Sequence, residues 1–474
     1  MEMIMKYICV VLAALQTFAF SLFTSSGTQS IGVNKYAENQ TFESFGTSSA
    51  WWSQTISDEE TAREIARLLY DDETGLGLDV YRYNIGAGEK ENPATRIGDI
   101  NRRAESFYVF NEETGEYEYD FTRDANARRM LDMAVEYGAS EVILFCNSPH
   151  FSMTASGHAS GGLTPYFSNL PKENYMAFVD YVLTIADWFV AQGYPVTAVS
   201  PINEPQWAWG GDWVGQEACH YSADETVEVL ELFAVEMQKR NSPYKLSGPE
   251  NGELSPGYYE YIDKFFASEV LRDFCDTYSA HSYWLDNNIE LKNAAGEKFK
   301  NEHPNVKLEM SEWCELPLTI DSTTIDSGLY MANIMVQDLN LLNVVSWQSW
   351  TAVNGDGLME LKNGETVLYN RYYAYKHFSN FIKKGMVRVD VMDSFGEKSR
   401  LASTAFKGDG ETVIVLVNNA GTKKEIKLFD FCKTMEIYQT DKKHNCEQVY
   451  SGGYTRNVEL PAKSITTVVM HDIL

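Results

Sequence analysis

Short apolar runs recur along most of the chain and are separated by longer segments of helical periodicity. Eight of these runs predict strands, at residues 41–46, 78–85, 142–147, 197–202, 245–247, 277–282, 307–310 and 344–347. Several are continuously apolar, which is typical of parallel strands covered on both faces. Eight strand–helix units in succession predict an α/β fold, a closed (β/α)8 TIM barrel over residues 41–384.

Two of the intervening helices have clear limits in the sequence. Between Tyr175 and Val190 the apolar side chains fall on one helical face, and this helix is expected to end at Gly193. Ser57 and Glu60 have the spacing of a capping box, which predicts a helix that starts at Ser57.

The pattern changes after residue 384. Short β-type runs lie at 388–391, 401–406, 412–417, 425–429, 434–438 and 464–470, separated by Gly, Asn and Asp turns. No long helical pattern interrupts them, so residues 385–474 are predicted to form a C-terminal antiparallel β-sandwich domain. The upstream segment 27–40 contains a further short apolar run at 31–33, which can add a strand to this sandwich.

The N-terminus has the pattern of an export signal. Residues 8–23 are apolar and are followed by the small residues 24–27, so we predict a signal peptide over residues 1–26 and a secreted or extracytoplasmic protein. Glu2 offsets Lys6 in the expected basic region, which weakens this pattern. A membrane anchor is the alternative, but the apolar stretch is short for a span. We therefore expect no stable membrane insertion after signal cleavage.

Composition narrows the classes of partner. The formal charge of −28 argues against nucleic acid, which requires a basic surface. Aromatic residues make up 13% of the chain, and several of the ten tryptophans fall in predicted loops after strands. They include Trp207, Trp209, Trp213 and Trp284, which could serve as flat platforms for a ligand with apolar faces, such as a polysaccharide or oligosaccharide.

Cysteine and histidine spacing argues against a metal. The seven cysteines show no C-x-x-C pattern, and the eight histidines show no H-x-H or H-x-x-x-H pattern at a strand end. We expect no metal, and no cofactor, since no G-x-G-x-x-G opens a helix after a strand. Cys432 and Cys446 are spaced to bridge a hairpin, but free thiols are the preferred interpretation.

Two glutamates follow predicted strands and carry the candidate chemistry. Glu204 lies in Asn203-Glu204-Pro205 after the fourth strand, and Glu312 lies in Ser311-Glu312-Trp313 after the seventh. In a (β/α)8 barrel the reacting groups lie at these carboxyl ends of the strands. Two carboxylates facing each other there can cleave a glycosidic bond, one protonating the leaving oxygen and the other attacking or stabilising the sugar. A solvated strand end would explain Asn-Glu-Pro alone, and a carbohydrate-binding barrel without catalysis would be expected to lack one of the two carboxylates.

The order of several motifs resembles glycoside hydrolase family 30, a retaining family of clan A. The motifs are Phe45-Gly46 with Ala50-Trp51-Trp52, Tyr81 to Gly88, Ser148-Pro149 with Met153-Thr154, Asn203-Glu204-Pro205, His281-Ser282-Tyr283, Ser311-Glu312 and Trp347-Gln348-Ser349-Trp350. The resemblance implies that Glu204 is the acid/base and Glu312 the nucleophile. It implies that Asn203 contacts the sugar 2-hydroxyl and that Tyr283 hydrogen-bonds the nucleophile.

Further substrate-binding residues follow from the same resemblance. Arg82 would help keep Glu312 ionised, or form a structural ion pair, and Glu89 falls where an acidic group often holds sugar hydroxyls, or is a solvated glutamate. Trp350 matches an aromatic floor beside the cleaved bond. The remaining candidates are Trp347, which could instead be barrel core, Trp52, and Asn147, which stands with Cys146 where relatives often carry an aromatic residue.

The resemblance is strongest to endo-β-1,6-galactanases, which act on arabinogalactan side chains. It rests on the Ala50-Trp51-Trp52 element and the segment from Ser148 to Thr154. Other family specificities stay open: β-1,6-glucanase, xylanase, exo-acting β-galactosidase or fucosidase, and glucosylceramidase.

Overall fold

The structure is a computed structural model that describes residues 2–24, 29–213, 215–286 and 288–472. In this part of the chain nine parallel strands form one sheet in the order β8-β7-β6-β3-β2-β12-β11-β10-β9. Their bounds are β2 Ser44–Ser48, β3 Val80–Asn84, β6 Glu141–Phe145, β7 Val196–Ser200, β8 Lys245–Leu246, β9 Pro249–Asn251, β10 Thr277–His281, β11 Lys307–Glu312 and β12 Ser346–Ser349.

The two edges of this sheet are consecutive in the chain, so the sheet closes into a barrel. β8 pairs with β7, and β9 pairs with β10, with only Ser247 and Gly248 between β8 and β9. The predicted fifth strand is therefore divided into two short pieces, each of which pairs with one neighbour. The predicted (β/α)8 barrel is confirmed, with eight strand positions around the closed sheet.

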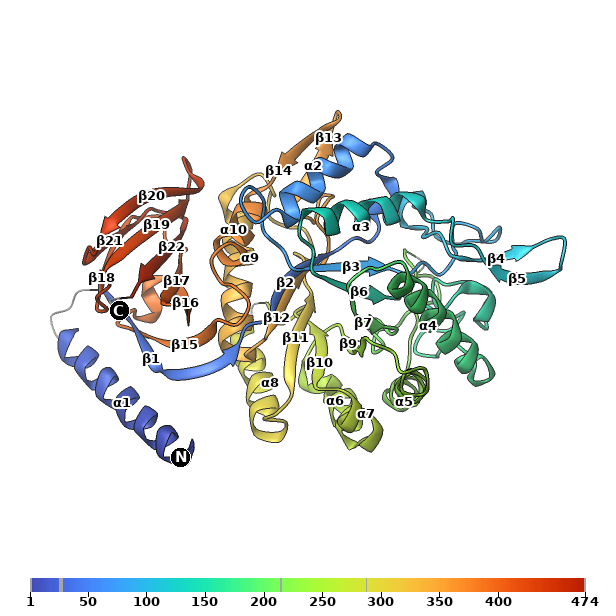
Figure 1. Cartoon of the computed structure of the whole chain (residues 1–474), viewed down its shortest axis with the longest axis horizontal. Coiled ribbons are helices and arrows are strands. Elements are labelled where there is room, and N and C mark those ends of the chain that lie inside the picture. The colour runs from blue at the N-terminus through green and yellow to red at the C-terminus, as the bar shows by residue number, and fades with distance from the viewer. Residues whose placement is uncertain (1, 25–28, 214, 287, 473–474) are drawn as a thin grey trace. The chain divides into compact units, whose positions relative to one another are not determined.

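Helices follow the barrel strands (Figure 1). Their bounds are α2 Glu59–Tyr70, α3 Ala125–Tyr137, α4 Tyr175–Ala191, α5 Ala223–Arg240, α6 Tyr259–Ala267, α7 Glu269–Phe274, α8 Ile289–Glu302, α9 Ile325–Gln337 and α10 Asn370–Ser379. Two antiparallel hairpins lie in the connections: β4 (Tyr108–Asn111) with β5 (Glu116–Tyr119), and β13 (Met359–Lys362) with β14 (Glu365–Leu368).

The two predicted helix limits have different outcomes. The amphipathic pattern from Tyr175 to Val190 forms α4, which ends at Ala191 just before the predicted stop at Gly193. The predicted cap at Ser57 is wrong. The N-cap of α2 is Asp58, whose carboxylate accepts from the backbone N–H of Thr61 at 2.8 Å. Both side chains can cap a helix, and the chain turns into the helix one residue later than the Ser57–Glu60 spacing indicated.

The C-terminal strands form the predicted antiparallel domain. Nine strands are ordered β20-β19-β22-β17-β16-β15-β1-β18-β21, with bounds β1 Ser30–Thr41, β15 Val387–Asp393, β16 Leu401–Gly408, β17 Glu411–Asn418, β18 Lys424–Leu428, β19 Thr434–Thr440, β20 Asn445–Gly453, β21 Asn457–Leu460 and β22 Ser464–His471. Ile426 and Val458 near one end of the sheet share a buried cluster with Ile414 and Ile437 from the other half. The sheet therefore folds over a single core as a sandwich.

The N-terminal strand β1 belongs to this second sheet. It contains the apolar run at 31–33, and it pairs antiparallel with β15 and, at Ser30 and Ile31, parallel with β18. The chain divides into two compact units. One contains residues 45–314 and 346–354, and the other contains residues 1–44, 315–345 and 355–474. The barrel helices α9 and α10 thus belong to the same unit as the sandwich.

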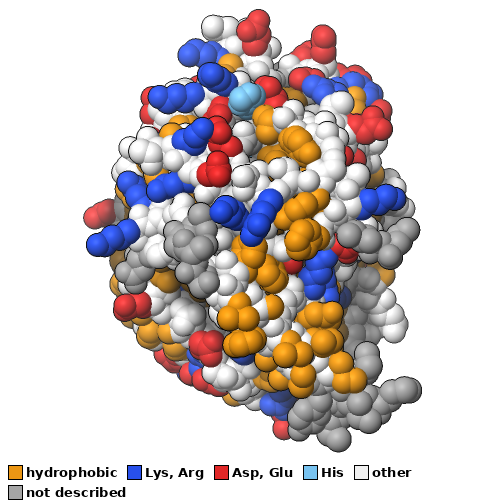
Figure 2. Space-filling view, turned by 90° about the vertical axis from the view of Figure 1, so that its left-hand side faces the viewer, with side chains coloured by type: hydrophobic (Ala, Val, Ile, Leu, Met, Phe, Trp, Pro, Cys, Tyr) orange, Lys and Arg blue, Asp and Glu red, His pale blue; other side chains and the backbone are white. Residues whose placement is uncertain are grey.

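The apolar N-terminal segment forms helix α1 (Glu2–Phe23), which lies against β1. Gln16 donates to the Val33 carbonyl at 2.6 Å, and the Phe20 ring meets Phe429 edge-on. The outer face of α1 exposes the large apolar side chains Ile8, Val10, Val11, Leu15, Phe18 and Leu22. Figure 2 shows hydrophobic side chains gathered on this side of the protein. Within the described residues, no helix combines the length and the apolar character needed to cross a membrane.

All seven cysteines are free thiols, including Cys432 and Cys446. This agrees with the preferred interpretation of the hairpin pair, in which the two thiols are not bridged.

Candidate active site

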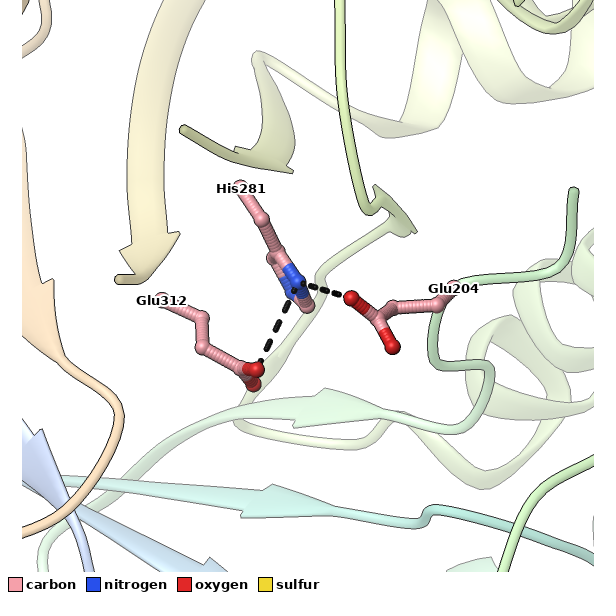
Figure 3. A group of neighbouring side chains, drawn as sticks. All are labelled: Glu204, His281 and Glu312. Carbon is pink, nitrogen blue, oxygen red and sulfur yellow. Dashed lines mark hydrogen bonds and ion pairs between the residues drawn. The ribbon is translucent and has the colours of Figure 1, made fainter. Parts of the chain in front are cut away.

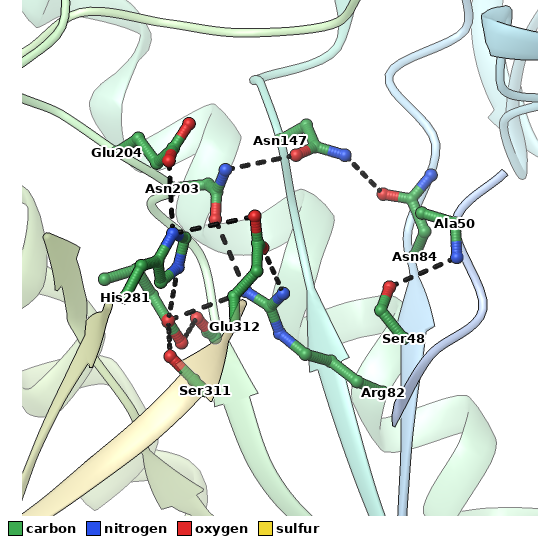
Figure 4. Close-up of polar contacts among 12 residues, drawn as sticks. Ser48, Ala50, Arg82, Asn84, Asn147, Asn203, Glu204, His281, Ser311 and Glu312 are labelled. Carbon is green, nitrogen blue, oxygen red and sulfur yellow. Dashed lines mark hydrogen bonds and ion pairs between the residues drawn. The ribbon is translucent and has the colours of Figure 1, made fainter. Parts of the chain in front are cut away.

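Charged and polar side chains from five strand positions meet at the carboxyl ends of the barrel strands (Figure 4). Arg82 lies within β3, and Glu250 lies in β9. His281 and Glu312 are the last residues of β10 and β11, and Glu204 follows β7. Parallel strands of a barrel end on the same face, so residues up to 230 positions apart in the sequence become neighbours. The cluster lies within the compact unit that contains residues 45–314.

Glu204 and Glu312 face each other across His281 (Figure 3). The His281 Nδ1 atom lies 3.1 Å from Glu204 Oε1 and 3.6 Å from Glu312 Oε1. One carboxylate oxygen of Glu204 lies within 4.8 Å of one carboxylate oxygen of Glu312. Glu204, Glu312 and His281 are 7%, 4% and 0% exposed. The site therefore places two carboxylates side by side at the edge of a desolvated cluster.

Glu312 is held by donors on both of its oxygens. Arg82 Nη1 donates to Oε2 at 2.8 Å, and the Tyr283 hydroxyl donates to Oε1 at 3.0 Å. Burial raises the pKa of Glu312 above its ordinary value, and the neighbouring His281 and Arg82 cations act in the opposite direction. Burial also raises the pKa of Tyr283 well above its usual value, which keeps its hydroxyl a donor.

A third carboxylate, Glu250, lies behind His281. Its Oε2 lies 3.2 Å from His281 Nε2 and 3.5 Å from Arg82 Nη2. Burial alone would raise the pKa of Glu250, but Arg82 and His281 lower it to about 2. Burial alone would lower the pKa of His281, but Glu312, Glu204 and Glu250 raise it to about 10. His281 is therefore a cation at neutral pH, enclosed by three carboxylates.

Irregular pairing of two strands positions these side chains. Ala280 of β10 pairs with Met310 of β11, whereas the next residue His281 pairs with Glu312, so Ser311 is an extra residue in the ladder. In a regular strand Ser311 and Glu312 would point to opposite faces. A bulge re-aims side chains, and such bulges are common beside active sites. The hydroxyl of Ser311 reaches Glu250 while Glu312 reaches Arg82.

A second irregularity, in the pairing of β9 with β10, positions Glu250. Ser279 pairs with Pro249 and Ala280 pairs with Asn251, which leaves Glu250 unpaired in the ladder. Glu250 has φ 60 and Glu204 has φ 46, both in the left-handed region that a residue with a Cβ seldom adopts. The backbone N–H of Glu204 donates to the Glu250 carbonyl at 2.9 Å, so the two strained residues are also joined through the main chain.

A row of amides extends from the carboxylates toward β3. Arg82 Nη2 donates to Asn203 Oδ1 at 3.3 Å, Asn203 Nδ2 donates to Asn147 Oδ1 at 3.3 Å, and Asn147 Nδ2 donates to Asn84 Oδ1 at 3.1 Å. Asn203 and Asn147 therefore belong to the same hydrogen-bonded cluster as Arg82. The Arg82 guanidinium also lies 3.9 Å over the Phe145 ring.

Three of the predicted tryptophans, Trp350, Trp347 and Trp52, are buried. Trp350 is 8% exposed and lies edge-on to Trp51, with ring centroids 5.3 Å apart. Trp347 is completely buried near Trp313, as the barrel-core interpretation describes. Trp52 is buried and donates from Nε1 to the Ser48 carbonyl at 3.0 Å.

Glu89 is completely buried, so it is not the solvated glutamate that the sequence also allowed. Its Oε1 accepts from the backbone N–H of Ala159 at 2.5 Å and from Asn92 at 3.4 Å. Its backbone N–H donates to the buried Glu217, whose pKa burial raises well above the usual range. These contacts join three loop segments to one another.

Potential ligand atoms of Glu204, His281 and Glu312 lie within 4.8 Å of one another, which is close enough to hold a metal ion. Both imidazole nitrogens of His281 already face carboxylate oxygens, Nδ1 facing Glu204 and Nε2 facing Glu250. A protonated imidazole has no free lone pair for a cation. The ion pairs of His281 with the carboxylates explain why these atoms lie close together.

Sequence reasoning did not assign roles to His281 or Glu250. His281 belongs to the motif His281-Ser282-Tyr283, which the resemblance includes. Its position at the end of a predicted buried strand, where Glu204 and Glu312 also lie, could have indicated a role in the site. Glu250 lies three residues beyond the predicted strand 245–247, in Pro249-Glu250-Asn251. That segment resembles the strand-end Asn203-Glu204-Pro205, but its inward direction depends on a bulge that local sequence does not reveal.

Comparison with known proteins places the chain in a family. The sequence model of O-Glycosyl hydrolase family 30 matches residues 28–359, and the chain belongs to this family. It is therefore a glycoside hydrolase with a carbohydrate substrate.

An endo-beta-1,6-galactanase from Hypocrea rufa is 24% identical over 415 residues, covering 81% of this chain and 82% of the relative. An exo-beta-1,6-galactobiohydrolase from Bifidobacterium longum subsp. longum is 22% identical over 355 residues, covering 58% of this chain and 23% of the relative. The crystal structure of a conserved exported protein from Bacteroides fragilis matches with a TM-score of 0.84 at 24% identity, covering 93% of this chain and all of that one. That structural likeness concerns the fold.

Proposed function

We propose that the chain is a retaining endo-β-1,6-galactanase that uses Glu312 as nucleophile and Glu204 as acid/base. The observation that carries the mechanism is the proximity of the two carboxylates, with one oxygen of each within 4.8 Å. Retaining glycosidases hold their carboxyl groups roughly 5–5.5 Å apart, whereas inverting enzymes leave about 6.5–9.5 Å for a water molecule. The separation here matches direct attack on the sugar.

The two glutamates have different surroundings, as the two roles require. Glu312 receives Arg82 and Tyr283 on its two oxygens, and these donors favour the ionised form and oppose the effect of burial on its pKa. Glu204 would protonate the leaving oxygen in the first step and remove a proton from water in the second. Asn203 would contact the sugar 2-hydroxyl from its place beside Arg82.

Aromatic side chains near Glu204 support an extended substrate. The Trp209 indole donates to the Glu204 carbonyl at 2.8 Å, and its ring lies 4.7 Å from that of Trp213. Trp213 and Trp284 are 44% and 56% exposed, which is high for tryptophan beside a buried cluster. Exposed aromatic faces give contact area to successive sugar rings. A run of such platforms favours internal cleavage over removal of single end sugars.

The galactan assignment draws on relatives. The two relatives named above are an endo-beta-1,6-galactanase and an exo-beta-1,6-galactobiohydrolase, so both names carry the β-1,6 linkage. Identities near a quarter leave β-1,6-glucanase and xylanase as the competing specificities. The platforms around Trp209 and Trp213 favour the endo mode among the galactan-active alternatives.

Product analysis tests the proposal in a single experiment. De-arabinosylated arabinogalactan should yield a ladder of β-1,6-galacto-oligosaccharides, with little release from xylan or β-1,6-glucan. Proton NMR during the first minutes should show the β-anomer as the initial product. Galactose alone from the start would refute the endo mode, stronger action on xylan or glucan would refute the substrate, and an initial α-anomer would refute the retaining mechanism.

We also propose that the protein is exported and that α1 is its signal segment. The apolar outer face of α1 and the small residues after it support this, and the structurally similar Bacteroides fragilis protein is described as exported. N-terminal sequencing of the protein from its native source should find a start close to residue 27. A start within residues 1–8 would refute cleavage.

A further inference from the structure

Glu250 contacts both cations of the site through His281 Nε2 and Arg82 Nη2. The other nitrogens of these two side chains, His281 Nδ1 and Arg82 Nη1, meet Glu204 and Glu312. Glu250 is completely buried. The Ser200 hydroxyl donates to Oε1 at 2.7 Å, and the Ser311 hydroxyl donates to Oε2. Together with Arg82 and His281, these groups bring side chains from four other strands to one carboxylate.

Burial of the charged Glu250 side chain by itself lowers the stability of the fold, so a functional role for this charge would explain its presence. A buried carboxylate loses its hydration, and only paired cations and hydrogen bonds offset that loss. Glu250 also needs a bulge in β9 and a left-handed backbone with φ 60. Strain of this kind persists where the surrounding structure enforces it, which is common at functional sites.

The reaction proposed above moves negative charge from one side of His281 to the other. In the first step the bond between the anomeric carbon and the leaving oxygen breaks, and a bond to a Glu312 oxygen forms. Glu204 transfers its proton to the leaving oxygen and becomes an anion, while Glu312 becomes a neutral ester. Water then reverses both changes. His281 Nδ1 lies 3.1 Å from Glu204 Oε1 and 3.6 Å from Glu312 Oε1, so its N–H can stabilise whichever carboxylate carries the charge.

We propose that Glu250 is a positioning residue that holds His281 and Arg82 in place as cations throughout the catalytic cycle. It faces His281 Nε2 and Arg82 Nη2, which leaves His281 Nδ1 directed at the two glutamates and Arg82 Nη1 at Glu312. Its negative charge does not change when Glu204 and Glu312 exchange theirs. This inference rests on the proposed roles of Glu204 and Glu312 and is independent of the identity of the sugar.

The test replaces Glu250 by its isostere in the full-length protein. Glu250→Gln keeps the size and an acceptor oxygen but removes the charge. We expect kcat to fall about 10²-fold with little change in KM, because Glu250 acts through His281 and Arg82, which it contacts, and has no binding role of its own. Both polysaccharide and an activated aryl glycoside should lose activity alike, because both chemical steps depend on His281. The matched control is Glu309→Gln on β11, which removes a carboxylate that accepts from Ser279, and kcat should stay within twofold of wild type.

A direct titration separates positioning from a general loss of structure. NMR spectra of protein labelled with ¹³C-histidine are recorded over a range of pH. The signal that is missing from the spectrum of a His281→Asn variant belongs to His281 and gives its pKa. The groups that face this imidazole are Glu204, Glu250, Glu312 and the ring of Tyr283, with Arg82 behind Glu250. Removal of one carboxylate should lower the pKa of His281 by about 1–3 units from its wild-type value.

An unchanged His281 titration, or a kcat for Glu250→Gln within twofold of wild type, would overturn the inference. If Glu250→Gln does not fold, Ser311→Ala removes a donor to Glu250 and keeps its charge. That variant should lose kcat several-fold at constant KM, and an unaltered kcat would again overturn the inference. Wild-type cleavage of the natural polysaccharide by Glu204→Gln and Glu312→Ala would instead refute the proposed function. Inactivity of those two variants with normal Glu250→Gln kinetics would refute only the role of Glu250.

Discussion

At the scale of single residues, the site is a compact set of alternating charges in a nearly dry environment. Arg82 and His281 lie between the carboxylates of Glu204, Glu250 and Glu312, so each buried charge has an opposite neighbour. Removal of one member leaves the others uncompensated, which is more harmful than the loss of a single contact. Substitutions here should therefore lower activity strongly and can also lower stability.

The role of Glu312 as nucleophile makes the first prediction. Glu312→Ala should abolish turnover, because no carboxylate remains to attack the anomeric carbon. Added azide should enter the vacated space and restore cleavage of an activated glycoside, with a glycosyl azide of inverted configuration as the product. The measurement is NMR of that product. Recovery of wild-type products without azide would contradict the assignment.

The role of Glu204 makes the second prediction. Glu204→Gln cannot donate a proton, so cleavage of the natural polysaccharide should fall about 10²–10⁴-fold. An aryl glycoside with a good leaving group needs little protonation and should lose far less in its first step. The ratio of the two losses in kcat/KM is the measurement. Equal losses on both substrates would indicate that Glu204 has a structural role.

The third prediction concerns pH and His281. Its pKa rises from an ordinary 6.5 to about 10 on folding, so the folded state holds this proton more tightly than the unfolded state. The stability from this proton is fully present below pH 6.5 and is lost as the pH rises toward 10. The difference in unfolding free energy between wild type and His281→Gln should therefore shrink from pH 6 to pH 9.5. Denaturant unfolding at several pH values measures it, and a constant difference would contradict the assigned protonation.

At the scale of elements, irregular pairing in the short strands β9 and β11 directs polar side chains toward the site. Each contains one extra residue relative to β10, Glu250 in β9 and Ser311 in β11. A regular register would send one side chain of each adjacent pair away from the site. The bulges therefore increase the number of polar groups that face the barrel mouth.

The segment after β9 makes the fourth prediction. A Cβ on Gly252 would overlap Trp207 Nε1 and lie 2.9 Å from Glu204 Oε1. Gly252→Ala should displace the Glu204 carboxylate and lower kcat/KM by about 10²-fold, since misplacement of a catalytic group by about 1 Å can cost that much. The matched control is Gly257→Ala, where the new Cβ would meet Ser255 at an ordinary 3.9 Å. Steady-state kinetics of both variants is the measurement, and equal activities would contradict the steric account.

At the scale of the whole molecule, the sandwich shares a compact unit with the last two barrel helices. Asn333 of α9 and Asn419 exchange hydrogen bonds at 2.8 and 3.0 Å. His377 of α10 lies buried between the hydroxyls of Thr467 and Thr440. Burial lowers the pKa of His377 to about 3, so this histidine is neutral. These contacts make the sandwich a structural partner of α9 and α10.

The fifth prediction is that the sandwich cannot be removed. A chain that ends at Lys384 would uncover His377 on α10 and leave β1 without its partner β15. We expect this shortened protein to be insoluble or to melt far below the full-length protein. Its solubility and melting temperature are the measurements. An unchanged melting temperature together with full activity would show that residues 385–474 form a detachable module.

Much of the architecture could be predicted from local sequence. Parallel barrel strands are buried on both faces, so their apolar runs mark them, and eight such runs with helices between them leave few alternatives to a barrel. The short β-type runs after residue 384, separated by Gly, Asn and Asp turns, marked the sandwich. Because barrel chemistry occurs at strand ends, two glutamates that both follow predicted strands were a candidate pair, and the structure brings Glu204 and Glu312 together.

Only the tertiary structure decided how these residues are supported. The inward direction of Glu250 and Ser311 depends on register shifts between strands, which are set by pairing across the sheet and not by the neighbouring residues. The charge of His281 depends on three carboxylates, two from strands β9 and β11 and one from the loop after β7. Burial of Trp347, Trp52 and Glu89 likewise depends on which distant segments cover them. Local sequence fixes which side chains a strand carries, whereas packing between strands fixes which of them meet and in what state of charge.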